Sequence, residues 1–422
     1  MILRARVVVT MDGPPIENGA VVISGNRVLD VGEFPEISAR HSGQELVDLG
    51  EQALLPGLIN AHCHLDYTML RNTIPAQPSF TEWIRQINAQ KAGMSAEDYL
   101  EAITAGFAEA QRWGTTTIAN VEAFPELVPR LPLPQLRTFW FSELIDVRSS
   151  SSPRDLIAAA LSFSEGRANA KIRFGLSPHA PFTASPELYR LAAESARRDG
   201  ILLMTHLAES REEIQMFRDG EGPLFDFLKS IGRPMEDCGS ETPLAFMLNR
   251  HELDEDWIVV HLNELTKDDF ILLARRPRFQ IVHCPRSHAY FRHSPFALGR
   301  LRQLGFNICL GTDSLASNTS LSLFAEMQSL WRTFPSLSPH QVLEMVTVNA
   351  AQALHEKNEL GRLRAGYYAD LIAVPSEGKV GDVFEEIIGF NEPVSWMMAD
   401  GPAADNILSL PGFSFLLSFS QF

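Results

Sequence analysis

Eight short apolar segments recur along the middle of the chain, and stretches with the spacing of amphipathic helices separate most of them. The segments cover residues 54–64, 115–122, 137–145, 172–180, 201–209, 257–264, 279–285 and 307–314. Their continuous apolar character is typical of parallel strands that are buried on both faces. Eight such strands alternating with helices predict an α/β fold, a (β/α)8 TIM barrel.

The two ends of the chain follow a different pattern. Short β-branched segments separated by Gly, Asn and Pro fill the first fifty residues, and residues 361–399 are similar. We predict a small β-sandwich domain from residues 1–55 and 360–405, a barrel over 56–359, and an apolar tail over 406–422. The tail is expected to pack against a domain or another subunit, which leaves a homo-oligomer open.

The composition excludes several classes of protein. The 422 residues include 36 Lys and Arg and 52 Asp and Glu, for a formal net charge of −16. Such an acidic surface argues against broad binding of nucleic acids or anionic membranes. We see neither a secretory signal nor an apolar run long enough to span a bilayer. Four scattered cysteines without a CxxC pair favour a reducing compartment. We therefore expect a cytoplasmic protein that acts on small molecules.

Nearly every apolar segment ends in a polar or ionisable residue. The carboxyl ends of barrel strands meet at one mouth, where the active sites of this fold lie. We interpret His283 as a buried structural histidine and expect most of the others to surround a pocket. The residues at segment ends are His62 and His64, Glu122, Glu143, His179, His206 with Glu209, His261, His283 and Asp313.

The histidines have the pattern of a metal site. His62 and His64 stand two residues apart at a strand end, so both imidazoles point to the same side. His206 is a candidate third ligand, and Asp313 is a candidate carboxylate ligand. His261 is either a fourth nitrogen ligand or a partner of bound water. This set of donors suits Zn²⁺ or Fe²⁺, and an ion with an open position lowers the pKa of its water.

Two carboxylates have alternative interpretations. Glu209, three residues after His206, either reaches the metal-bound water or substrate, or caps the following helix. Asp313 is either a ligand or a helix cap. Ser317 and Asn318 lie closer to the next helix, so the cap does not require Asp313.

Five of these motifs, in this order, resemble the amidohydrolase superfamily. They are PGLINAHCHLD (56–66), THLAES (205–210), VVHLNELT (259–266), HCPRSHAYF (283–291) and LGTDSLASN (310–318). The chain is most similar to the mononuclear branch, which contains cytosine deaminase-like, S-adenosylhomocysteine/methylthioadenosine deaminase-like and triazine hydrolase-like enzymes. The motif HCPRSHAYF and the segment FTEWI (80–84) are also similar to those of aminodeoxyfutalosine deaminases. The resemblance extends to about residue 400.

The resemblance implies one divalent ion, Zn²⁺ before Fe²⁺, and a set of catalytic residues. Asp313 and the ion together generate hydroxide, Glu209 moves protons to the substrate, and His261 orients the water. The implied metal ligands are His62, His64, His206 and Asp313.

The implied reaction is hydrolytic deamination of an aminated N-heterocycle, with release of ammonia. We expect a purine nucleoside-like substrate of the aminodeoxyfutalosine, methylthioadenosine or S-adenosylhomocysteine type. The candidate substrate-binding residues are His179, Trp83 and Glu143. Trp83 stands where related deaminases place a Trp against the ligand, but it also fits a core aromatic on its helix. His288 stands where many relatives carry Asn, which argues against simply copying the S-adenosylhomocysteine assignment.

Three other functions compete with this one. A triazine-type chloro- or aminohydrolase uses the same machinery with another leaving group. A binuclear cyclic amidohydrolase needs a carboxylated Lys at the fourth strand, and Lys171 lies at the wrong end of that segment. An inactive scaffold is expected to have lost metal ligands, yet all four candidates are present.

Overall fold

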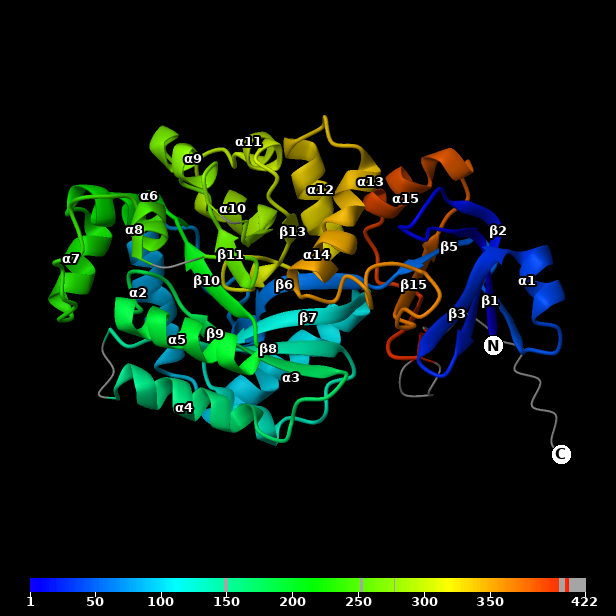
Figure 1. Ribbon diagram of the computed structural model, residues 1–422, viewed down its shortest axis with the longest axis horizontal. Coiled ribbons are helices and arrows are strands. Elements are labelled where there is room, and N and C mark those ends of the chain that lie inside the picture. Colours follow the sequence, from blue (N-terminus) through cyan, green and yellow to red (C-terminus); the bar gives the residue numbers. More distant parts are fainter. Residues whose placement is uncertain (148–150, 251–252, 277, 402–406, 410–422) are drawn as a thin grey trace.

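The computed structural model describes residues 1–147, 151–250, 253–276, 278–401 and 407–409. Parallel strands in the middle of the chain form a barrel with the order β13-β12-β11-β10-β9-β8-β7-β6-β14 (Figure 1). β13 and β14 belong to one apolar segment, so the pairing of Asp313 in β14 with Cys63 in β6 closes the barrel. The predicted (β/α)8 barrel is confirmed. Its strands are β6 (Leu58–His64), β7 (Thr115–Glu122), β8 (Arg137–Leu144), β9 (Ile172–Pro178), β10 (Leu203–Leu207), β11 (Trp257–His261), β12 (Gln280–His283), β13 (Ile308–Leu310) and β14 (Asp313–Ser314).

Helices lie outside the barrel strands (Figure 1). Local sequence sets their ends: Ser185 accepts a hydrogen bond from the Leu188 amide at the start of α5, Pro186 takes the first helical position, and Gly200 ends the helix with φ 65°. The helices are α2 (Phe80–Lys91), α3 (Ala96–Arg112), α4 (Pro153–Ser164), α5 (Pro186–Asp199), α6 (Arg211–Ile214), α7 (Pro223–Ser230), α8 (Pro243–Arg250), α9 (Lys267–Leu273), α10 (Pro285–Phe291), α11 (Leu298–Gln303), α12 (Leu323–Thr333), α13 (Pro339–Glu344) and α14 (Val348–Ala353).

The two chain ends meet in a separate mixed sheet beside the barrel, as expected (Figure 1). Its order is β17-β16-β15-β5-β1-β2-β3, and β4 also pairs with β1. The domain boundaries stay a prediction. Apart from β17, the predicted tail lies outside the described residues. The elements are β1 (Ile2–Val8), β2 (Ile16–Ser24), β3 (Arg27–Glu33), α1 (Phe34–Arg40), β4 (Leu46–Asp48), β5 (Gln52–Pro56), β15 (Leu371–Pro375), α15 (Val383–Gly389), β16 (Trp396–Met398) and β17 (Ile407–Ser409).

The first apolar segment, which we expected to be one barrel strand, divides between the two sheets at Gly57. Here the backbone packs so closely that a Cβ would lie 2.2 Å from the side chain of Thr116. A buried ion pair also joins the sheets: Nε of Arg137 in β8 lies 3.3 Å from a carboxylate oxygen of Asp370. The close approach at Gly57, whose amide also donates to the Asp370 carbonyl at 2.9 Å, fixes the start of β6 and with it the histidines at the far end of that strand.

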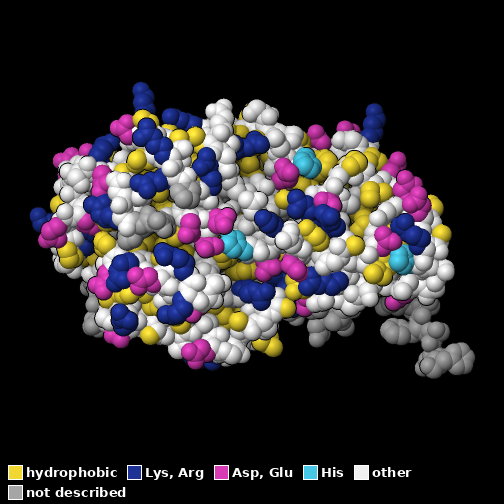
Figure 2. Space-filling view, viewed as in Figure 1, with side chains coloured by type: hydrophobic (Ala, Val, Ile, Leu, Met, Phe, Trp, Pro, Cys, Tyr) yellow, Lys and Arg dark blue, Asp and Glu magenta, His cyan; other side chains and the backbone are white. Residues whose placement is uncertain are grey.

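Two surface observations agree with the composition. On the face in Figure 2, basic side chains are interspersed with acidic ones rather than gathered in a stripe. Among the described residues, no helix is both long and apolar enough to cross a membrane.

Barrel closure generates a first prediction. A Cβ on Gly311 would lie 2.6 Å from the carbonyl oxygen of His62, so Gly311→Ala forces the closing strands apart. We expect the free energy of unfolding to fall by about 1–3 kcal/mol, as in other overpacked cores. Gly299→Ala in α11 is the control, because nothing lies within 4 Å of the added methyl. Urea unfolding of both variants tests this, and a fully stable Gly311→Ala would contradict it.

Candidate active site

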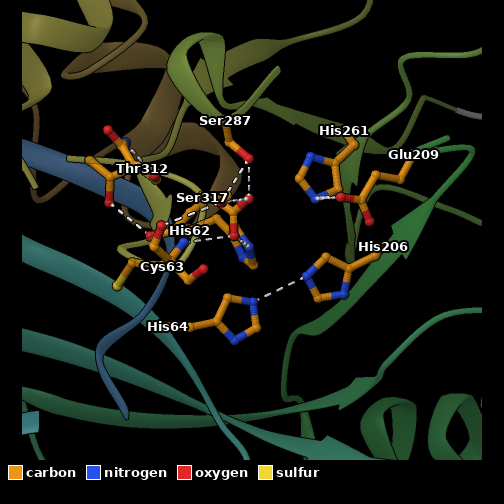
Figure 3. A network of polar contacts seen from close by, with 12 residues as sticks. His62, Cys63, His64, His206, Glu209, His261, Ser287, Thr312 and Ser317 are labelled. Carbon is orange, nitrogen blue, oxygen red and sulfur yellow. Dashed lines mark hydrogen bonds and ion pairs between the residues drawn. The ribbon is translucent and has the colours of Figure 1, made fainter. Parts of the chain in front are cut away.

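Three imidazoles meet at the carboxyl end of the barrel (Figure 3). His62 and His64 come from the end of β6, and His206 comes from β10 across the barrel. One ligand atom from each lies within 4.8 Å of the others, and all three residues are buried. The Nε2 atoms of His64 and His206 are 3.3 Å apart. The structure thus brings together three of the four predicted metal ligands as one histidine cluster.

The histidine cluster fits a divalent ion. Nδ1 of His206 donates a hydrogen bond to the His179 carbonyl at 2.9 Å, which leaves Nε2 as the free lone pair. Nε2 of His62 has no hydrogen-bond partner. Burial lowers the pKa of His206 to about 3 and that of His64 well below its usual value, so both are neutral, as ligands must be. Two nitrogens on one tetrahedral Zn²⁺ lie about 3.3 Å apart, the spacing seen here.

Asp313 borders the histidine cluster. Its Oδ1 lies 3.8 Å from Nε2 of His62, and its Oδ2 accepts hydrogen bonds from Ser287 at 2.6 Å and Ser317 at 3.3 Å (Figure 3). Burial alone would raise the pKa of Asp313. The nearby imidazoles of His62, His261 and His64 outweigh burial, so the pKa lies well below its usual value. A charged carboxylate therefore faces the imidazoles, and both serines orient it.

Glu209 and His261 form a pair on the other side of the cluster. Oε1 of Glu209 lies 3.5 Å from Nε2 of His261 (Figure 3). Burial, with the charges of Asp313 and Glu213, raises the pKa of Glu209 well above its usual value. Burial lowers the pKa of His261 well below its usual value. Burial therefore favours the protonated form of Glu209 and the neutral form of His261, an arrangement suited to proton transfer.

The backbone at these strand ends is strained, and its amide groups are held in place. Ala208, His261, Leu262 and Asp313 all have φ between 49° and 75°, the left-handed region that non-glycine residues rarely occupy. The carbonyl of Ala208 accepts hydrogen bonds from the amides of residues 263 and 264 at 3.0 and 2.9 Å. The side chain of Glu213 accepts the amides of Ala208 and Glu209 at 3.1 and 2.7 Å.

A cavity opens onto the histidine cluster, and its wall includes the three predicted substrate-binding residues. Nε2 of His179 lies 4.0 Å from Oε1 of Glu143, and Nδ1 lies 2.6 Å from the hydroxyl of Thr183. Burial is the main cause that lowers the pKa of His179 to about 3. Trp83 fits both interpretations, a ligand-facing residue and a core aromatic. It lines the cavity and also packs on Phe291, with ring centres 5.0 Å apart.

The amidohydrolase family model matches residues 53–395 of this chain, which is most of its length. The chain belongs to the amidohydrolase family. It is 29% identical over 386 residues to the 5-methylthioadenosine/S-adenosylhomocysteine deaminase of Moorella thermoacetica, covering 89% of this chain and 85% of that protein.

Two solved structures show the same fold. A zinc-bound adenosine deaminase from Xanthomonas campestris matches with a TM-score of 0.80 and 22% identity, over 97% of this chain and 94% of that one. The aminofutalosine deaminase of Helicobacter pylori, in complex with methylthio-coformycin, matches with a TM-score of 0.85 and 19% identity, over 95% and 98%.

His283 and Lys171, which we considered from the sequence, do not belong to the histidine cluster of this amidohydrolase. His283 stacks on Phe296 with ring centres 3.9 Å apart, as a structural histidine does. Lys171 immediately precedes β9, at the end of the barrel opposite the cluster. A carboxylated Lys171 therefore cannot bridge two ions at this site.

Two glutamates whose carboxylates accept backbone amides around the site were not predicted from the sequence. Glu212 and Glu213 follow the THLAES motif and look like ordinary acidic residues in the first turn of a helix. The signal that distinguishes Glu213 is burial: its side chain is fully enclosed, and burial raises its pKa to about 7. Such a residue is recognisable only from the folded chain.

The buried Glu122 generates a prediction on pH. Burial is the main cause that raises its pKa from 4.5 to about 7. The fold therefore disfavours the charged form, and this residue's contribution to stability falls as pH rises from about 4.5 to about 7. Because Gln stays neutral, we expect Glu122→Gln to gain up to about 3 kcal/mol relative to wild type across this range.

Unfolding free energies measured at pH 5 and pH 8 test the Glu122 prediction. The exposed Glu101→Gln is the control and should show a pH-independent difference from wild type. A Glu122→Gln difference that is equally flat would contradict the prediction.

Proposed function

We propose that this amidohydrolase is a metal-dependent deaminase of a purine nucleoside-like substrate. The observation that carries the proposal is the placement of Glu209 and His261 beside the histidine cluster, on the wall of a cavity that also contains Glu143 and His179. Proton-transfer groups, a metal-binding cluster and a substrate cavity thus share one location. The deaminase names of the curated relatives support the same activity.

We assign one ion, Zn²⁺, to His62, His64, His206 and Asp313. Three nitrogen ligands and one carboxylate suit Zn²⁺ and leave room for a water molecule. A bound ion of this kind would lower the pKa of water and so supply hydroxide for attack on the ring carbon that carries the amine. The zinc in the Xanthomonas campestris structure supports the choice of metal.

The chain's own residues supply the proton transfers. Asp313 is a charged acceptor for the proton of an attacking water molecule. Glu209 donates a proton to a ring nitrogen of the substrate, then takes the proton of the added hydroxyl and transfers it to the departing amine. The proton held by Asp313 returns to Glu209 at the end of the reaction. His261, 3.5 Å from Glu209, orients the water. The products are ammonia and a ring carbonyl.

Three residues bind the heterocycle and its substituent. Trp83 offers an aromatic face to the ligand, while Glu143 and His179 offer hydrogen-bonding groups at the wall. We also propose that the protein acts on a small-molecule substrate and is located in the cytoplasm.

Release of ammonia tests the function directly. We expect zinc-loaded protein to release ammonia from adenosine-type nucleosides and not from cytosine or guanine. Chloride release from a chlorotriazine, with no ammonia from any nucleoside, would favour the triazine hydrolase alternative and contradict the proposal.

The role of Glu209 yields a further prediction. Glu209→Gln removes the transferable proton but keeps the size of the side chain, so kcat should fall by roughly 100-fold or more. Zinc content should stay at the wild-type level. Glu221→Gln, on an exposed position of the same region, is the control and should keep full activity. A fully active Glu209→Gln would exclude Glu209 as the proton shuttle.

A further inference from the structure

Glu326 is a buried carboxyl group that the proposed mechanism does not use. It lies in the first turn of α12, its side chain is fully enclosed, and it is not among the described residues that line the cavity. An enclosed carboxyl group costs free energy unless hydrogen bonds satisfy it. Oε2 of Glu326 accepts the backbone amide of Arg286 at 2.9 Å, and Oε1 accepts the side-chain NH2 of Asn318 at 2.7 Å. Both oxygens are therefore bonded to other segments of the chain.

Both partners of this carboxyl group stand next to a serine that orients Asp313. Arg286 precedes Ser287, whose hydroxyl donates to Oδ2 of Asp313 at 2.6 Å. Asn318 follows Ser317, whose hydroxyl donates to the same oxygen at 3.3 Å. The two serine hydroxyls are 3.0 Å apart (Figure 3). The carboxyl group on α12 thus joins the two segments that carry the hydrogen-bond donors to Asp313.

Asn318 extends this connection to the backbone beside Asp313. Its NH2 group also donates to the carbonyl of Thr312, the preceding residue, at 2.8 Å, and its Oδ1 accepts the amide of Thr319 at 2.7 Å. Turning the amide group over would break both hydrogen bonds, so Asn318 is held as a donor toward Glu326. Asp313 itself has φ 55°, a conformation that a non-glycine residue keeps only when its surroundings fix it.

We propose that Glu326 is a positioning residue for the Asp313 carboxylate and acts through Ser287 and Ser317. The inference rests on the proposed function, in which Asp313 is a metal ligand and a proton acceptor. The two hydroxyls hold Oδ2, which leaves Oδ1 on the side of His62, 3.8 Å from its Nε2. Groups that hydrogen-bond a ligating carboxylate fix its direction toward the ion. Without Glu326, both serine segments lose their common anchor, and the carboxylate loses its fixed direction.

Glu326→Gln tests the proposal with little change in size or charge. Burial, with a smaller contribution from the charge of Asp313, raises the pKa of Glu326 to about 8, so the group is largely neutral at pH 7. The NH2 group of Gln cannot accept a hydrogen bond, so either the Arg286 amide or the Asn318 side chain loses its acceptor. Glu385→Gln, on an exposed position of α15, is the matched control.

Zinc affinity and steady-state kinetics at pH 7 are the main measurements. For Glu326→Gln, we expect the zinc dissociation constant from chelator competition to rise about 10-fold and kcat at saturating zinc to fall about 10-fold. KM should stay within about threefold of wild type, because Glu326 does not line the cavity. The visible absorption of the Co²⁺-loaded protein, which reports the arrangement of the metal ligands, should also shift. The control should match wild type in all four properties.

A background in which Ser287 and Ser317 are both Ala separates positioning from a general loss of stability. If Glu326 acts through the two hydroxyls, adding Glu326→Gln to this background should change zinc affinity and kcat by less than about threefold. An equal effect of Glu326→Gln in both backgrounds would overturn the proposal. A lower free energy of unfolding with unchanged zinc affinity and an unchanged Co²⁺ spectrum would also overturn it.

Failure of the proposed function is distinguishable from failure of this inference. Absence of ammonia from every nucleoside with zinc-loaded wild-type protein would contradict the proposed function. The zinc dissociation constants and Co²⁺ spectra do not require turnover, so they would still decide the role of Glu326.

Discussion

The structure depends on the convergence of three buried imidazoles whose lone pairs point to one place. Either one shared proton or a metal ion can lie between the Nε2 atoms of His64 and His206, 3.3 Å apart, whereas Nε2 of His62 has no hydrogen-bond partner. The fold nevertheless encloses them, and it holds His206 in one tautomer through the carbonyl of His179. A metal ion bound here would satisfy all three rings at once and would stabilise so polar a cluster inside a barrel.

The backbone next to the histidine cluster is also held in a fixed conformation. The strand ends that present Glu209, His261 and Asp313 contain residues in the left-handed region, each at a cost of order 1–3 kcal/mol. Hydrogen bonds from neighbouring strand ends and to the Glu213 carboxylate offset this strain. The preceding residue, Glu212, accepts the first amides of α2. One short segment after β10 therefore connects the histidine cluster, Glu209 and the start of α2.

Much of this arrangement could be predicted from sequence, because it depends on periodic and positional signals. Apolar segments that end in His or Asp locate both the strands and the mouth of the barrel, and the His62-x-His64 spacing defines one face of a strand. Other features depend on contacts distant in sequence. The division of the first apolar segment at Gly57 follows from the approach of Thr116. The roles of Glu212 and Glu213 follow from where their carboxylates point, which helix-capping rules do not distinguish. Trp83 could be interpreted as core or as cavity wall, and only the folded chain shows that it is both.

The central claim is that four side chains from β6, β10 and β14 hold a single catalytic metal ion. The most direct measurement is anomalous diffraction at the zinc edge from crystals of the zinc-loaded protein. The account predicts one strong peak per chain, within bonding distance of His62, His64, His206 and a carboxylate oxygen of Asp313. Two peaks in the barrel mouth, or a peak that these side chains do not surround, would contradict it.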